Sequence, residues 1–219
     1  MTTPRPHRMA VVAVIGTTQT IAWASSYYLP AILGAPIAAA LHLPQSAFFA
    51  IFSGALLLSA ALGPRVGRLI DRHGGRAVLA LSNVVLALGL ALLAVARGAA
   101  SLVLAWTVLG IGIAMGLYDP AFSTLTRLYG REARGPITGI TLIAGFASTI
   151  GWPLSAVLAH FFGWRAACLV WAGLDLLVAA PLNWWLIPPV GQAAPAAVAV
   201  RAEAAEPPRG AMPILAFYF

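Results

Sequence analysis

The sequence predicts an all-α membrane protein with six transmembrane helices and both termini in the cytoplasm. Three observations predict this fold class: a composition too apolar for a water-soluble domain, six apolar stretches long enough to cross a bilayer, and arginines gathered in alternate connections between those stretches. The first observation gives the class of protein, and the other two give its topology.

The composition is that of a chain surrounded by lipid. Of its 219 residues, 61% are hydrophobic and 9% are charged, whereas a soluble domain carries about 25% charged residues. The net charge of +7 comes from arginine, because the chain contains no lysine. The arginines lie in short connections, which indicates membrane topology and argues against a nucleic-acid-binding surface.

Six stretches have the length of about 20 apolar residues that a helix needs to cross the hydrocarbon core. They are residues 9–33, 45–66, 77–96, 101–121, 136–161 and 165–187. These stretches are continuous and rich in Ala and Leu, without the alternation of a barrel wall. Because a helix satisfies its own backbone groups without water, we expect each stretch to be a helix.

The arginines predict the orientation of these spans. Eleven fall on one side if the spans alternate: Arg5, Arg8, Arg65, Arg68, Arg72, Arg76, Arg127, Arg131, Arg134, Arg201 and Arg209. Arg97 and Arg165 fall on the other side. Positively charged connections stay in the cytoplasm, so we expect both termini there and the protein in a bacterial inner membrane.

The composition changes after the sixth span. Residues 188–210 are rich in proline and alanine, which predicts a flexible cytoplasmic linker. Residues 211–219 are apolar again, but nine helical residues extend only about 13 Å. We interpret them as the start of a truncated seventh span, with a short amphipathic anchor as the alternative.

The run Gly67-Arg68-Leu69-Ile70-Asp71-Arg72-His73-Gly74-Gly75-Arg76 follows the second span. It resembles the signature of the major facilitator superfamily, except that Gly75 stands where the family prefers a basic residue. The resemblance implies a cytoplasmic gating motif made of Gly67, Asp71, Arg72, Gly74 and Arg76. An ordinary positively charged loop with a turn at Gly74-Gly75 is the alternative.

The motif residues have a physical interpretation of their own. Gly67 would allow a close approach between helices. Asp71 can accept charged hydrogen bonds and face the positive end of a helix dipole. Arg72 and Arg76 can pair with Asp71 or bind acidic groups and lipid phosphates.

The resemblance covers the first half of a typical family member, which implies one half (a 3+3 inverted repeat) of a major facilitator fold. Residues 17–23 and 25–30 are similar to the monocarboxylate and oxalate/formate branch. Two features depart from the family. Trp106 stands four residues before Gly110, where an arginine is frequent, and Gly151-Trp152-Pro153 only loosely matches the antiporter motif.

In the family, spans one, two, four and five line a central cavity, and spans three and six face lipid. The resemblance therefore implies cavity-lining candidates on spans one, four and five: Gln19, Trp23, Tyr27, Tyr118, Asp119, Thr141 and Trp152. Polar side chains within a membrane are costly unless they have a role. Hydrogen bonding between helices and interfacial aromatic anchoring are the alternative roles.

Two acids lie within the apolar stretches. Asp119 shares a helical face with the small residues Gly112 and Gly116, and it could pair with Arg127 or Arg131 or take part in proton or cation coupling. Asp175 could hydrogen-bond through a neighbour to Asn183, or bond to another chain. Neither role is decided by the sequence.

The resemblance implies transport of a small solute through the lipid bilayer by alternating access. The alternatives are a non-transporting fragment and a half-transporter that needs a second six-helix half or a second copy. An intramembrane enzyme is disfavoured, because the sequence holds no catalytic motif, metal-ligand pattern or cofactor loop. Cys168 is the sole cysteine, so an intramolecular disulfide is excluded.

Overall fold

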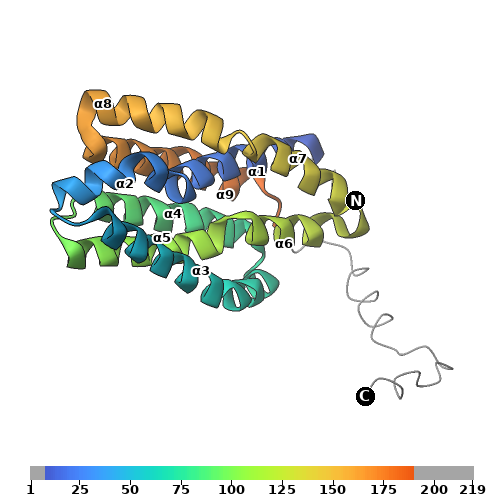
Figure 1. The fold of residues 1–219 in the computed structure, drawn as a ribbon. Coiled ribbons are helices and arrows are strands. Elements are labelled where there is room, and N and C mark those ends of the chain that lie inside the picture. The colour runs from blue at the N-terminus through green and yellow to red at the C-terminus, as the bar shows by residue number, and fades with distance from the viewer. Residues whose placement is uncertain (1–7, 190–219) are drawn as a thin grey trace, which may run out of the picture.

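The computed structural model describes residues 8–189, which form a bundle of helices packed side by side (Figure 1). Residues 1–7 and 190–219 lie outside the described part. The predicted linker therefore falls outside it except for Pro188 and Pro189, and the predicted seventh-span start at 211–219 falls outside it entirely.

The first long helical segment, called a rod below, consists of α1 (Arg8–Ala22), a π-helical turn η1 (Trp23–Tyr27) and α2 (Leu29–Ala40). In η1 the Tyr28 N–H donates to the Trp23 carbonyl, five residues earlier, at 3.0 Å. Pro30 has no N–H to donate to the carbonyl four residues earlier, as a residue of a regular α-helix would. The turn before Pro30 is π-helical instead of α-helical. The irregularity therefore precedes Pro30, and the helix continues past the predicted end at residue 33.

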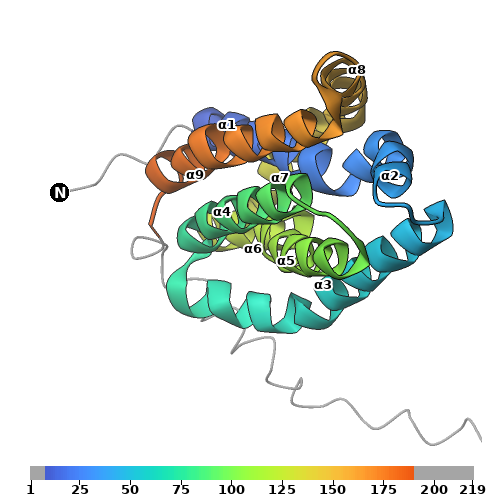
Figure 2. The same cartoon turned by 90° about the vertical axis from the view of Figure 1, so that its left-hand side faces the viewer.

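The second and third rods are α3 (Gln45–His73) and α4 (Gly75–Ala94), separated by Gly74 at a φ of 81°. Because α3 continues to His73, most of the predicted gating motif (residues 67–76) forms the last two turns of this helix and not a loop. α3 lies at an edge of the bundle in Figures 1 and 2. Only Phe48, Ala55, Val66 and Ile70 of its 29 residues are buried.

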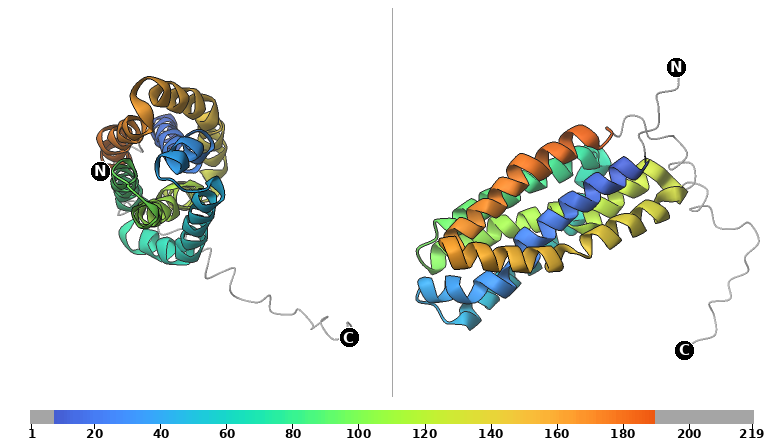
Figure 3. Two further views of the ribbon diagram at one scale, coloured as in Figure 1. Left: turned by 60° about the vertical axis from the view of Figure 1, so that its left-hand side comes forward. Right: turned by 90° about the horizontal axis from the view of Figure 1, so that it is seen from above.

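The rest of the described chain reverses direction twice. Its elements are α5 (Ala99–Gly116), α6 (Tyr118–Tyr129), a 3₁₀ turn η2 (Gly130–Ala133), α7 (Arg134–Ala144), α8 (Ala147–Leu174), a π-helical turn η3 (Asp175–Ala179) and α9 (Ala180–Leu186). The reversals follow Gly130, with a φ of 56°, and occur at Gly163, with a φ of 81°. Both angles favour glycine over other residues. Figure 3 shows the resulting rods from the side and nearly along their length.

Four helical stretches of the described chain are long and apolar enough to cross a membrane: Arg8–Ala40, Gln45–His73, Gly75–Ala94 and Ala99–Leu186. The last of these contains both reversals. The prediction of six spans stays a prediction at this point.

Small residues bring α4 and α5 into close contact. A Cβ placed on Gly112 would lie 2.7 Å from Leu86 Cδ2, and one on Gly116 would lie 2.5 Å from Ser82 Oγ. Gly112 and Gly116 of α5 therefore pack against α4, as small residues do where membrane helices approach closely. Trp106 is fully buried beside Phe48 and Phe52, so the position that differs from the family contributes to the core.

Candidate functional site

A break between α5 and α6 shapes the site. Leu117 has an extended conformation (φ −83°, ψ −157°) between the two helices. Pro120 lacks an N–H, so in a continuous helix the carbonyl four residues earlier, that of Gly116, would lose its donor. Gln19 of α1 supplies it, because its Nε2 donates to the Gly116 oxygen at 2.6 Å. Gln19 is buried and stabilises the break rather than lining an open space.

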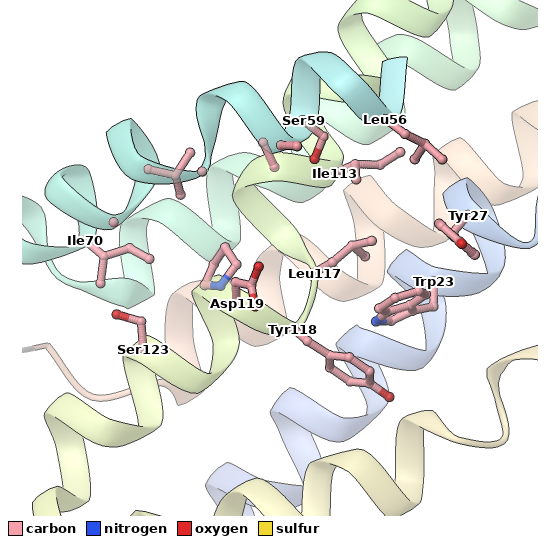
Figure 4. A pocket seen from close by; sticks show the side chains of 16 residues that line it. Trp23, Tyr27, Leu56, Ser59, Ile70, Ile113, Leu117, Tyr118, Asp119 and Ser123 are labelled. Atoms are coloured by element: carbon pink, nitrogen blue, oxygen red, sulfur yellow. The ribbon is translucent and has the colours of Figure 1, made fainter. Parts of the chain in front are cut away.

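A cavity of about 380 Å³ lies beside this break. One wall is α3, with Leu56, Ser59 and Gly63; the other walls come from η1, the end of α5 and the start of α6. Figure 4 shows the side chains of Trp23, Tyr118 and Asp119 opposite the α3 wall. The volume of the cavity is within the range of pockets that hold small molecules, about 300–1,000 Å³.

Four of the seven predicted cavity residues line this cavity: Trp23, Tyr27, Tyr118 and Asp119. The other three lie elsewhere. The Gln19 amide donates a hydrogen bond to the Gly116 carbonyl at the helix break. Thr141 is exposed and donates to the Ile137 carbonyl of its own helix at 2.8 Å. Trp152 packs edge-on against Tyr28, with 6.0 Å between ring centroids, and does not line the cavity.

Asp119 has no ion-pair partner among residues 8–189. The expected pairing with Arg127 or Arg131 is not formed, because the Arg127 side chain extends to α3 instead. Asp119 is exposed at the cavity and lies in the first turn of α6. The cavity lining contains no Arg, Lys or His, so a single carboxyl group dominates its electrostatics.

The predicted gating motif makes a contact that the sequence did not reveal. Arg127 Nη1 donates to Asp71 Oδ1 at 2.8 Å, and Arg127 Nη2 donates to the Asp71 carbonyl at 3.3 Å. Asp71 therefore joins the ends of α3 and α6, and among the described residues its salt bridge is with Arg127 and not with Arg72. The Arg76 guanidinium lies 4.7 Å from the centroid of the Trp184 ring.

The two flanking glycines of the motif differ in their surroundings. A Cβ on Gly67 would meet nothing within 4 Å, so the expected close helix approach is absent from the described residues. Gly75, by contrast, lies against the side chain of Thr124, and an added Cβ would collide with it. This contact gives a physical reason for glycine at the position where the family prefers a basic residue.

Replacing Gly75 with alanine is expected to lower the free energy of unfolding by about 1–3 kcal/mol, because the new methyl group overpacks a buried threonine. The measurement is unfolding of the purified chain in detergent micelles. Gly173→Ala is the matched control, because a Cβ on Gly173 meets nothing within 4 Å. Equal stabilities for the two variants would contradict this account of the motif.

A chain of buried polar side chains crosses the bundle between α1, α4, η3 and α9. Thr18 Oγ1 donates to Asn183 Oδ1 at 2.9 Å, Asn183 Nδ2 donates to Asn83 Oδ1 at 3.0 Å, and Asn83 Nδ2 donates to Asp175 Oδ1 at 3.4 Å. Asp175 is thus joined to Asn183 through a neighbour, as one of the expected arrangements had it.

Thr18 and Asn83 are the members of this network that the sequence did not reveal. The resemblance assigned the third and sixth spans to the lipid, yet Asn83 and Asp175 are buried inside the bundle. The available signal was an amide within an otherwise apolar stretch, which is costly in a membrane without a partner. Among the described residues, no group of three or more His, Cys, Asp or Glu side chains could hold a metal ion.

Comparison with known proteins places these features in a family context. A family model with the description "Major Facilitator Superfamily" matches residues 14–216. The chain is 35% identical over 129 residues to "Uncharacterized 38 kDa protein in 23S RNA operon" of Thermoproteus tenax, covering 58% of this chain and 33% of that protein. It is 30% identical over 118 residues to "Multidrug resistance protein fnx1" of Schizosaccharomyces pombe, covering 53% of this chain and 22% of that protein. The chain thus matches less than half the length of either relative.

Proposed function

The chain belongs to the Major Facilitator Superfamily, and from this premise we propose that it moves a small solute across a membrane by alternating access. The observation that carries the proposal is the cavity at the α5–α6 break, which is walled by helices that are far apart in the sequence. A helix broken inside a membrane protein is typical of a solute site, because irregular backbone is tolerated there where it lines a cavity.

The proposed topology has six spans with both termini in the cytoplasm of a bacterium. Figure 1 shows the start of α1 and the ends of α3, α6 and α9 at one end of the bundle. Arg72, Arg127 and Arg131 lie at this end, whereas Arg97 and Arg165 lie at the other. The positive-inside rule then supports a cytoplasmic location for the arginine-rich end.

We further propose that a second six-helix half, or a second copy of this chain, packs against α3 to complete the transporter. Little of α3 is buried. Away from the cavity, the exposed residues Ala50, Gly54, Leu57 and Ala61 share one helical face, and a Cβ placed on Gly54 would meet nothing within 4 Å. Such an exposed apolar face with small residues suits packing against another helix. The alternative is a fragment that inserts into the membrane but transports nothing.

Uptake by proteoliposomes tests this function. The chain is reconstituted alone, and the product of its complete reading frame is reconstituted separately; both are screened against a panel of labelled cations, anions, sugars and amino acids. Uptake of one solute class above that of empty liposomes is expected for at least one preparation. Insertion with no uptake by either would support the non-transporting alternative.

Asp71 and Arg127 are proposed to stabilise one of the two conformations of the transport cycle. Their side chains are 59% and 31% exposed, and such a pair contributes about 0–1 kcal/mol to stability. A bias of about 1 kcal/mol nevertheless changes a two-state population about fivefold. Asp71→Asn is therefore expected to lower the uptake rate by up to about fivefold without altering insertion or melting temperature.

The matched control for Asp71→Asn is Glu132→Gln. It makes the same carboxyl-to-amide change and breaks the exposed Arg8–Glu132 pair, whose atoms lie 2.7 Å apart. Exchanging the two charges, with Asp71→Arg and Arg127→Asp together, should restore part of the lost rate. Uptake that is unchanged by Asp71→Asn would remove the gating role.

A further inference from the structure

Three aromatic side chains lie together on one side of the cavity. The ring centroids of Trp23 and Tyr118 are 4.8 Å apart, and those of Trp23 and Tyr27 are 5.2 Å apart. Trp23 and Tyr27 come from η1, and Tyr118 comes from the first residue of α6. The faces of such rings carry partial negative charge and attract cations.

The carboxyl group of Asp119 is beside these rings. It follows Tyr118 directly, and Figure 4 shows it in the same wall, opposite Ser59 of α3. No described residue forms a salt bridge with it, although the other exposed acids of the described chain, Asp71 and Glu132, each have an arginine partner. A carboxylate next to apolar walls is stabilised by an opposite charge more strongly than it would be in water.

The charges of the cavity select among solute classes. An anion would meet the Asp119 carboxylate with no basic lining residue to offset it. A neutral solute would leave that carboxylate without a counter-charge. The similarity to the monocarboxylate and oxalate/formate branch implies an anionic solute, and the lining of this cavity opposes that assignment.

The geometry points to an organic cation with apolar substituents, a quaternary ammonium or phosphonium ion for example, as the ligand of this cavity, held by Asp119 and the rings of Trp23, Tyr27 and Tyr118. The cavity volume of about 380 Å³ accommodates a molecule of drug size. This inference rests on the proposed function in one respect: the cavity is taken to be the solute site.

Asp119 also has a structural explanation that the test must separate from binding. An acid in the first turn of a helix is stabilised by the helix dipole. That role predicts a small change in melting temperature for Asp119→Asn. It predicts no change in the preference between a cation and an anion of equal size.

Equilibrium dialysis of the purified full chain tests the inference, with labelled tetraphenylphosphonium as the probe and equal detergent in both chambers. Tetraphenylborate, which has nearly the same shape and the opposite charge, measures the contribution of charge. We expect saturable binding of the cation and no saturable binding of the anion. Asp119→Asn should weaken cation binding about tenfold or more, and Glu132→Gln should leave it unchanged.

Trp23→Leu should weaken cation binding about fivefold through the loss of the cation–π contact. Trp152→Leu is its matched control, because Trp152 does not line the cavity. Equal binding of cation and anion, or cation binding insensitive to Asp119→Asn, would overturn the inference.

The uptake panel keeps this inference distinct from the proposed function. Cation binding that depends on Asp119, without uptake of any solute, would contradict transport and leave the ligand class standing. Uptake of an anion or a neutral solute that tetraphenylphosphonium does not inhibit would leave transport standing and overturn the ligand class.

Discussion

Asn83→Leu is expected to lower the free energy of unfolding by about 3 kcal/mol, the largest stability change that we predict for a single side chain of the described bundle. Asn83 accepts from Asn183 at 3.0 Å and donates to Asp175 at 3.4 Å. Leucine can do neither, so two buried polar groups lose their shared partner. Single interhelical hydrogen bonds in membrane proteins contribute only about 0.6 kcal/mol on average; the larger value reflects the loss of two bonds at once and the buried Asp175 oxygen that loses its Asn83 donor.

A double-mutant cycle in detergent micelles checks this expectation. Asn83→Leu, Asp175→Leu and the double variant are unfolded under identical conditions. Because the two side chains belong to one network, the double variant should be less destabilised than the sum of the single variants. Additive effects would show that the polar side chains act independently. Val84→Leu, on the exposed side of the same helix, should remain close to the wild type.

Ala60→Trp is expected to lower solute uptake by at least about tenfold, because the indole would occupy much of a cavity of small-molecule size. Ala60 lies on α3 and lines the cavity. Ala156 of α8 is exposed, does not line the cavity and is not on α3, where the second half is proposed to pack. Ala156→Trp is therefore the matched control, with the same change in side chain.

The initial uptake rate of the solute identified by the panel is the measurement for both alanine variants. Melting temperature and monodispersity of each purified variant show whether the bulky side chain has disturbed folding. Folded Ala60→Trp protein with the uptake rate of Ala156→Trp would mean that the solute does not pass through this cavity.

Much of the fold could be predicted from composition and length, because the apolar stretches are long and a helix is the economical structure within lipid. The ends of the helices could not. α3 continues through the gating motif to His73 since the arginines of its last turns remain exposed beyond the apolar part. The π-helical turn before Pro30 likewise depends on a backbone hydrogen bond from Tyr28 to the carbonyl five residues earlier, which the spacing of apolar residues does not reveal.

The candidate site was predicted in part. Trp23, Tyr27, Tyr118 and Asp119 were singled out as polar or aromatic residues on predicted lining spans, and they line the cavity together. Gln19 was singled out for the same reason but caps the carbonyl that Pro120 leaves without a donor. The partner of Asp71 lies 56 residues away on α6, a distance at which sequence patterns carry no pairing information.

The break at Leu117 has a consequence for how the two ends of α6 behave. Asp119, at the cavity, and Arg127, bonded to Asp71 at the end of α3, both belong to this twelve-residue helix. The extended conformation of Leu117 interrupts the helix between α5 and α6. A tilt of α6 relative to α5 would displace both groups together. A movement of α6 would therefore alter the cavity lining and the Asp71–Arg127 ion pair together.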